Sequence, residues 1–267
     1  MLLRVLALAR IMFLDGVRRH ALLGIVSLAI AAEAFGLLFM DFFGRDVGRA
    51  SSDYLFSVMW MAGLLFLFFH SVQVISWDEE RGAIYALLSR PISRGEYVLG
   101  VFVGLSALLT ALLLLLGPIA YLTLLWIKQS LASVYFPELS MGHFLLAWAG
   151  ILAMQIVILA VIMLFSGLVR GGFPVLLLSA SYYAICSGLP VVRASTAQHD
   201  GQGLNLLLQL MTALFPDFSR LDFKDEILTA ALSLDTAIIF TNFSVAILYA
   251  CVMVSLACWF YARRDLQ

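Results

Sequence analysis

The sequence predicts an all-α integral membrane protein made of a single domain, 1–267, and two observations support this. Hydrophobic residues make up 63% of the 267 residues and charged residues only 12%, whereas a soluble domain carries about 25% charged residues. The apolar residues also fall in long blocks, which give the chain a mean hydropathy of +1.01. Blocks of about 20 apolar residues have the length that a helix needs to cross the hydrocarbon core. We therefore expect transmembrane helices.

The first residues predict a helix that lies on the membrane and does not cross it. Residues 1–19 hold the apolar stretch LLRVLALARIMFLDGVR, which Arg4, Arg10, Asp15 and Arg18 interrupt. These charges are too many for a span, so we expect an N-terminal interfacial helix. An extension of the first span into the cytoplasm is an equally good interpretation. Because no small-residue cleavage site follows the charges, a cleavable signal peptide is not indicated.

Six apolar blocks predict six transmembrane helices. They comprise residues 21–40, 54–76, 98–127, 143–169, 173–192 and 237–262. Asp53, Ser140 and Asp235 each precede one of these blocks, as helix N-caps do. Gly100 and Gly104 form a GxxxG spacing in the third block, which permits close helix contact. Because that spacing is frequent by chance in glycine-containing spans, we interpret it as incidental.

Arginine and lysine residues indicate which loops face the cytoplasm. With the N-terminus inside, the inner segments carry ten of the sixteen basic residues and the outer segments carry six. Cytoplasmic loops are the ones enriched in these residues. We therefore expect both termini to be cytoplasmic and the chain to lie in the plasma membrane, the inner membrane of a prokaryote.

Two segments between the blocks do not span. The outer segment, 193–236, contains LNLLLQLMTALF at 204–215, which is too short to cross and predicts a re-entrant or interfacial helix. The inner segment, 77–96, is polar and predicts a short cytoplasmic helix. Asp78, Glu79 and Glu80 would form its first turn, where negative charge suits the helix dipole.

The inner segment also contains signals for where helices end and begin. Pro91 disfavours helical geometry at Arg90, so the short helix should end there. Ser93 and Glu96 have the S-x-x-E spacing of a capping box, which should begin the third span. A helix attached to a span at each end would tilt both spans when force is applied to it.

Residues 77–100 resemble the coupling-helix signature of type-2 ATP-binding-cassette permeases. They read WDEERGAIYALLSRPISRGEYVLG. Many members of the family have a similar pattern here, which consists of an acidic pair, a glycine, a hydrophobic stretch and then LLSxPVSRxxYxxGK. Ala83 and Val101 replace the usual Thr and Lys of that pattern. The stretches ALFPDFSRLDFKDEIL and FYARRDL are similar to the family in a more diffuse way, so the resemblance covers nearly the whole chain.

The resemblance implies a permease subunit of an exporter that forms the translocation pathway as a dimer, with a second copy or with a homologous permease. It implies that residues of the inner segment contact a separate ATPase subunit. These ATPase-coupling residues are Asp78, Glu79, Glu80, Arg81, Gly82, Leu87, Leu88, Ser89, Arg90, Pro91, Ser93 and Arg94. The chain itself would then be no enzyme and carry no cofactor, with ATP and Mg²⁺ on the partner.

The sequence itself also indicates that ATP binds to a separate chain. A phosphate-binding loop needs G-x-x-x-x-G-K-[ST], and the two lysines, Lys128 and Lys224, follow Ile and Phe. Cys186, Cys251 and Cys258 form no CxxC pair, so no metal site is indicated. We expect contact with lipids and, since no basic tract is present, none with nucleic acid.

Glu33 and His70 are ionisable residues inside predicted spans, which makes them candidates for a translocation pathway or a subunit interface. For Glu33 the alternative is solvation near the outer headgroups. Their different depths argue against a pair between them.

Other functions fit the sequence less well. An ATP-coupled mechanotransmission or maturation subunit without cargo passage remains open. An ion-coupled carrier usually has inverted repeats and broken helices, and the predicted spans show little of either. An intramembrane enzyme would need a catalytic cluster, and the sequence contains neither HExxH nor GxSxG. Cargo, direction, dimer type and ATPase identity stay open, although the apolar spans favour an amphipathic or lipid-like cargo.

Overall fold

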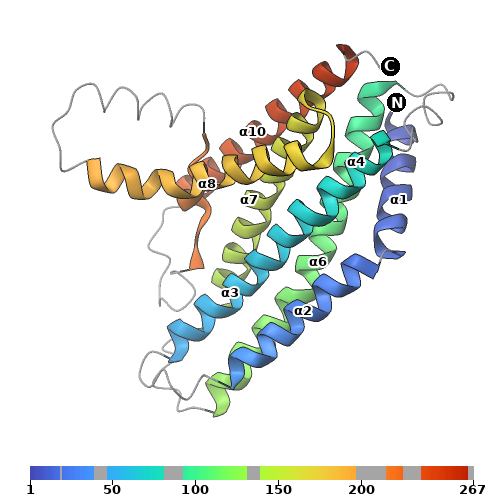
Figure 1. The fold of residues 1–267 in the computed structure, drawn as a ribbon. Coiled ribbons are helices and arrows are strands. Elements are labelled where there is room, and N and C mark those ends of the chain that lie inside the picture. The colour runs from blue at the N-terminus through green and yellow to red at the C-terminus, as the bar shows by residue number, and fades with distance from the viewer. Residues whose placement is uncertain are drawn as a thin grey trace.

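Long helices run side by side in the computed structural model (Figure 1), which describes residues 1–18, 20–38, 47–80, 93–130, 139–196, 215–224 and 236–263. The elements are α1 (Leu2–Arg18), α2 (His20–Leu37), α3 (Val47–Leu65), η2 (Phe66–Ser71), α4 (Val72–Glu80), α6 (Arg94–Ser130), α7 (Met141–Leu168), α8 (Gly172–Thr196), η4 (Phe218–Leu221) and α10 (Thr236–Arg263). Within these ranges every regular element is a helix, so the all-α prediction is confirmed.

Five helical stretches have the length and hydropathy of membrane spans. They are Val47–Ser76, Arg94–Ser130, Met141–Leu168, Gly172–Val192 and Thr236–Arg263. A sixth crossing results if α1 and α2 form one span that is bent by 59°. The predicted span 21–40 corresponds to α2. The part of the chain that the structure describes therefore contains five to six span candidates.

One predicted helix start is wrong. The second span begins at Val47 and not at residue 54, so Asp53 lies inside α3 and is no N-cap. The hydroxyl of Ser51 is satisfied within this extension, because it donates to the Val47 carbonyl one turn earlier, at 2.5 Å. Ser140 is the N-cap of α7, as predicted. Asp235 lies outside the described residues.

Contacts between helix ends place the start of α1 and the end of α10 at the same end of the bundle. Arg94, at the start of α6, donates to the carbonyl oxygens of Tyr261 and Ala262 in the last turn of α10, at 3.4 and 3.2 Å. Met1 lies beside Glu96 in the first turn of α6, and Figure 1 shows α1 and the last turn of α10 at the same end of the bundle. We call this the inner end. That it faces the cytoplasm remains a prediction.

α1 packs against α6 through two glycines. A Cβ atom on Gly100 would lie 2.6 Å from the Cβ of Leu8. A Cβ atom on Gly104 would lie 2.7 Å from the Cβ of Met12 and 2.9 Å from the carbonyl oxygen of Ala9. Only glycine fits at such separations. The GxxxG spacing is therefore a helix contact, and our interpretation of it as incidental is wrong.

The bend between α1 and α2 argues against α1 as a straight extension of the first span. Because α6 has 37 residues, it is about 55 Å long, whereas the hydrocarbon core is about 30 Å thick. The part of α6 that α1 covers can therefore lie at the membrane surface. Leu3 and Leu6 on the free face of α1 are 82% and 52% exposed, which suits contact with lipid. The interfacial position of α1 stays a prediction.

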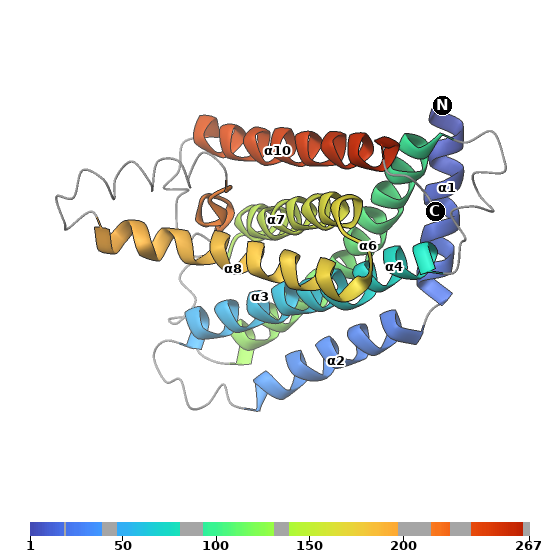
Figure 2. The ribbon, with the colours of Figure 1, turned by 45° about the horizontal axis from the view of Figure 1, so that its top comes forward.

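Residues 215–224 are the described part of the outer segment, and they pack into the bundle. The carbonyl of Leu221 approaches α7 so closely that only Gly150 fits opposite it. Phe223 stacks on Phe243 of α10, with ring centroids 6.0 Å apart. Figure 2 shows this segment between α7, α8 and α10. Apart from its last residue, the predicted re-entrant stretch 204–215 lies outside the described residues, so that prediction stays open.

The α1–α6 contact predicts opposite effects for the same substitution at two glycines. Gly104→Ala forces the main chain of α1 away from α6 and should lower the free energy of unfolding by about 1–3 kcal/mol. Gly24→Ala, on α2, meets no atom within 4 Å and should be neutral or stabilising by up to about 1 kcal/mol. Unfolding of both variants in mild detergent measures this. Equal effects would contradict the packing.

Candidate functional site

The structure describes the two ends of the predicted coupling segment, 77–96. The main chain of Asp78, Glu79 and Glu80 forms the last turn of α4, and Ser93 and Arg94 begin α6. The predicted coupling residues between these ends lie outside the described residues; they are Arg81, Gly82, Leu87, Leu88, Ser89, Arg90 and Pro91. The contacts of the site are therefore known on the α6 side.

The prediction that the three acidic residues open a new helix is wrong. They continue the helix of the second span to Glu80. Each added helical residue gains a main-chain hydrogen bond, whereas the interaction of an exposed charge with the helix dipole is worth only about 0.3–1 kcal/mol. The chain thus enters the predicted coupling segment as a continuous helix up to Glu80.

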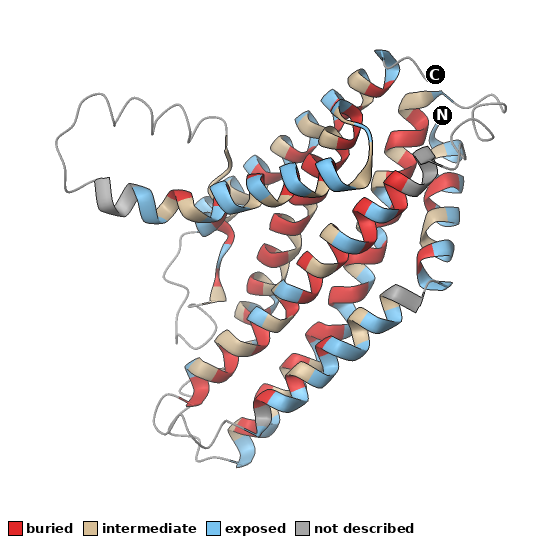
Figure 3. Cartoon of the chain, viewed as in Figure 1, coloured by how far each residue is buried: buried red, intermediate tan, exposed pale blue. Residues whose placement is uncertain are grey.

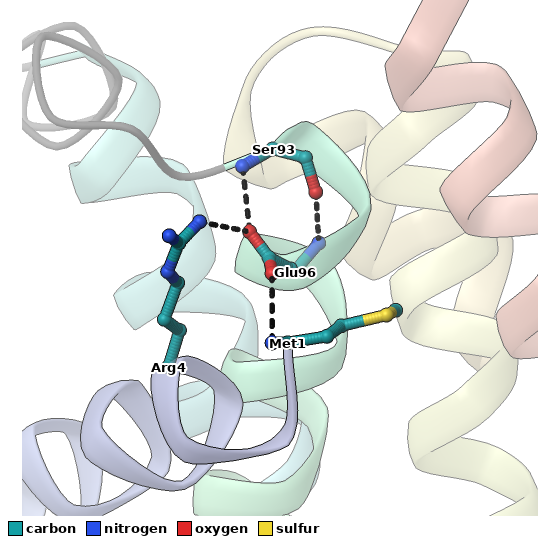
Figure 4. Close-up of polar contacts among 4 residues, drawn as sticks. All are labelled: Met1, Arg4, Ser93 and Glu96. Atoms are coloured by element: carbon teal, nitrogen blue, oxygen red, sulfur yellow. Dashed lines mark hydrogen bonds and ion pairs between the residues drawn. The ribbon is translucent and has the colours of Figure 1, made fainter.

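The predicted capping box at the start of α6 is confirmed. The carboxylate of Glu96 accepts from the main-chain N–H of Ser93 at 2.9 Å, and the hydroxyl of Ser93 accepts from the N–H of Glu96 at 3.2 Å (Figure 4). These bonds satisfy two of the N–H groups that a helix start leaves without a partner. The cap fixes the point at which the coupling segment joins α6.

The same carboxylate also attaches α1. A guanidinium nitrogen of Arg4 lies 3.9 Å from one Glu96 oxygen, and the amino group of Met1 lies 4.0 Å from the other (Figure 4). The Glu96 side chain is only 7% exposed, whereas that of Arg4 is 53% exposed. Ion pairs with such exposed partners contribute about 0–1 kcal/mol each. Glu96 therefore joins the coupling segment, α6 and α1 through one side chain.

Arg94 connects the same point to α10. Its bonds to the carbonyls of Tyr261 and Ala262 place a cation at a helix C-terminus, where the dipole favours it. The hydroxyl of Tyr261 in turn donates to that of Ser166 near the end of α7, at 3.0 Å. We call Arg4, Arg94, Glu96, Tyr261 and Ser166 the inner-end network. It links the end of the coupling segment to α1, α6, α7 and α10.

Glu33 lies away from this network, on α2. It is 2% exposed, which does not fit solvation by outer headgroups. Neither carboxylate oxygen has a hydrogen-bond donor among the described residues. The next carbonyl, that of Ala32, accepts from the hydroxyl of Tyr54 on α3 at 2.6 Å. Glu33 is thus buried where α2 meets the outer half of α3.

His70 lies in the π-helical segment η2 and is also 2% exposed. Its ring packs on Phe66, with centroids 5.1 Å apart. Along the second span, His70 is sixteen residues beyond Tyr54, which marks the level of Glu33. Sixteen helical residues correspond to about 24 Å. The two ionisable residues therefore lie at different depths, as predicted. π-helical turns are frequent at functional sites.

Sequence reasoning did not find Arg4, Tyr261 and Ser166 as members of the site. Their contacts with α6 or with each other join residues that are far apart in the chain, and no local spacing encodes such pairs. The capping box did mark Glu96, because its signal is local. Within the described ranges, no three His, Cys, Asp or Glu side chains gather as metal ligands would.

Comparison with known proteins finds a similarity that covers nearly the whole chain. A family model described as ABC-2 family transporter protein matches residues 6–266. The match runs from α1 to beyond α10 and includes the whole of 77–96. No curated protein matches the chain.

The two roles of Glu96 predict that its variants separate cap from ion pair. Glu96→Ala loses the bond from the Ser93 N–H and both ion pairs and should lower the stability of this helix start. Glu96→Gln keeps an oxygen that can accept from Ser93 but loses the charge. Hydrogen exchange should therefore speed up in α1 and the first turn of α6 for the alanine variant, and mainly in α1 for the glutamine variant. Unchanged exchange of α1 in Glu96→Gln would show that the ion pairs do not hold it.

Proposed function

The chain belongs to the ABC-2 family of transporter proteins, and from this premise we propose that it is the permease subunit of an ATP-driven exporter. Family and apolar helices together make it an integral membrane protein and a transport component, which is not an enzyme on its own. In our proposal the ATPase is a separate chain that binds ATP and Mg²⁺. Two permeases, either two copies or this chain and a homologue, form the pathway, with all termini cytoplasmic.

The attachment of the coupling segment at both of its ends is the observation that carries the proposal. On one side the segment continues the helix of α4 without a break up to Glu80. On the other side the Ser93–Glu96 cap attaches it to α6, with α1 and α10 bound to the same turn. A displacement of residues 81–92 by an ATPase would therefore move the second and third spans together.

The inner-end network determines which further helices would follow. α1 would move with Glu96, because its first turn is ion-paired there. α10 would move with Arg94, and α7 with Tyr261 through Ser166. Closure of an ATPase dimer would in this way change the arrangement of most of the bundle. Mechanotransmission without cargo passage would use the same contacts, and transport assays separate the two functions.

Purification from the native membrane tests the proposed partner. The tagged chain, isolated in mild detergent, should bring with it a nucleotide-binding-cassette ATPase in comparable amounts, as mass spectrometry would detect. Crosslinking through an introduced cysteine, Tyr85→Cys, should join this chain to the ATPase. A chain that purifies alone, even after crosslinking, contradicts the proposal.

Charge reversal in the coupling segment tests the mechanism. Glu80→Lys or Arg81→Glu should reduce the permease-dependent ATPase rate of the reconstituted complex about tenfold, which corresponds to about 1.4 kcal/mol, while insertion and folding persist. Replacement of Pro91 should also weaken coupling, because the short helix could continue into the third span.

A matched control for these variants is Arg10→Glu, which reverses an exposed charge on α1 outside the coupling segment. It should keep the wild-type ATPase rate. Normal coupling in both Glu80→Lys and Arg81→Glu would reject the coupling-helix assignment.

A further inference from the structure

A cavity of about 350 Å³ lies at the opposite end of the bundle from the inner-end network. Its walls come from α3, α7, α8 and the outer segment 215–224. Ligand pockets have volumes of about 300–1,000 Å³ and are mostly apolar with a few placed polar groups. This cavity lies at the lower end of that range, which suits one apolar chain or ring system.

α3 and α8 diverge from one another toward the outer end, and the cavity lies between them. At the inner end α8 packs against α4 and η2, and both views show α3 and α8 spreading apart from there (Figures 1 and 2). Where they begin to spread, the indole N–H of Trp60 donates to the hydroxyl of Tyr183 at 3.0 Å. The amide of Gln155 donates to the Trp60 carbonyl at 3.2 Å, which holds that helix turn against α7. Trp60 and Tyr183, which both line the cavity, form its floor.

The back wall is apolar and the mouth is polar. Ala147, Ile151 and Met154 of α7 line the wall and are at most 7% exposed. Ser57 of α3 and Ser187 of α8 also line the cavity but are exposed, so the mouth lies between these two helices. Figure 3 shows exposed residues along most of α8, whereas the residues of α7 are mainly buried.

The mouth lies in the outer half of both helices. In the span candidates Val47–Ser76 and Gly172–Val192, Ser57 is ten residues and Ser187 five residues from the outer end. At 1.5 Å per residue, these distances are about 8–15 Å. A molecule entering between α3 and α8 would therefore place its apolar part in the cavity and its polar part at the level of the outer segment.

Two opposite charges stand at that level. Asp222 and Lys224 line the cavity, their charged atoms are 3.4 Å apart, and both side chains are 41% exposed. Each keeps hydrogen-bonding capacity beyond the pair, since an ammonium has three donors and a carboxylate about four acceptor positions. A headgroup of a single charge would face a like charge from one of the two, which is unfavourable. A headgroup that carries both charges complements both residues.

From this geometry we propose that the cavity between α3, α7 and α8 binds one acyl chain of a zwitterionic phospholipid from the outer leaflet, with the headgroup at Asp222 and Lys224. The inference rests on the proposed function only in treating the bound lipid as cargo. The lipid enters sideways, between Ser57 and Ser187, and its chain ends at the Trp60–Tyr183 floor.

Photocrosslinking in lipid nanodiscs tests the site on the permease alone, without an ATPase. The probe is a phosphatidylcholine with a diazirine in one acyl chain, and peptide mass spectrometry locates the label. We expect label on cavity residues such as Phe56, Met154 and Tyr183. Ser57→Trp with Ser187→Trp should close the mouth and reduce that label about tenfold, because both side chains project from exposed positions.

The control for the mouth is Ser244→Trp with Ser255→Trp. Both serines are exposed on α10, and each donates to the carbonyl four residues earlier, as Ser57 does. Neither lines the cavity. This pair of substitutions should leave the label on the cavity unchanged. Label spread evenly over all exposed helix faces, or label that persists in the closed-mouth variant, would overturn the site.

Competition with unlabelled lipid tests the headgroup. Phosphatidylethanolamine should displace the probe about tenfold better than anionic phosphatidylglycerol in the wild-type chain. Asp222→Asn with Lys224→Gln should abolish that preference. Asp217→Asn with Arg220→Gln, which neutralises the neighbouring ion pair outside the cavity, should keep it. Equal competition by both lipids in the wild-type chain would reject the zwitterionic class.

These outcomes are separate from those of the proposed function. Lost labelling with intact ATPase coupling would reject the lipid site and keep the exporter proposal. Specific labelling of a chain that binds no ATPase would do the reverse.

Discussion

The close contacts along α6 are the constraint on which the rest of the structure depends. α1, α2, α3, α7 and α10 all pack against this helix. Inside a bilayer the hydrophobic effect gives helices little reason to associate, so close packing and interhelical hydrogen bonds must hold them. Gly100 and Gly104 provide the close approach for α1, and Gly117 provides it for Trp148 of α7, whose indole N–H donates to the Leu113 carbonyl at 3.0 Å. Three glycines of α6 thus set the spacing of α1 and α7.

The inner-end network joins several helices through few polar groups. Glu96 caps the start of α6 together with Ser93 and forms an ion pair with Arg4 of α1. Arg94, two residues earlier, donates to a carbonyl at the end of α10. Because both residues lie in the first turn of α6, the main chain there cannot shift without changing all of these contacts. A segment that joins α6 at this turn therefore acts on several helices at once, although it is covalently attached to only two.

Local patterns of the sequence predicted what local physics determines. The apolar blocks predicted the spans, and the S-x-x-E spacing predicted the Ser93–Glu96 cap. Errors arose where a contact distant in sequence, or helix continuation, decided the outcome. The GxxxG spacing had no visible partner in the sequence, since Leu8 and Met12 lie about 90 residues away. Asp53 was expected as an N-cap because it precedes an apolar block, and Asp78 in a first helical turn because of its charge, but uninterrupted main-chain hydrogen bonding places them within α3 and α4. The cavity is lined by four segments that are far apart in the chain, so no local sequence pattern could predict it.

The link between α7 and α8 constrains biosynthesis as well as the folded state. Only residues 169–171 connect the two helices, and Gly171 makes the turn with a φ of +92°, which other residues rarely adopt. Three residues reach at most about 11 Å, far less than the hydrocarbon thickness of about 30 Å. If both helices span the bilayer, a link this short keeps their inner ends on the same side, so the pair enters the membrane most directly as one hairpin. Arg170 lies in this link, so its single positive charge contributes to the orientation of both spans.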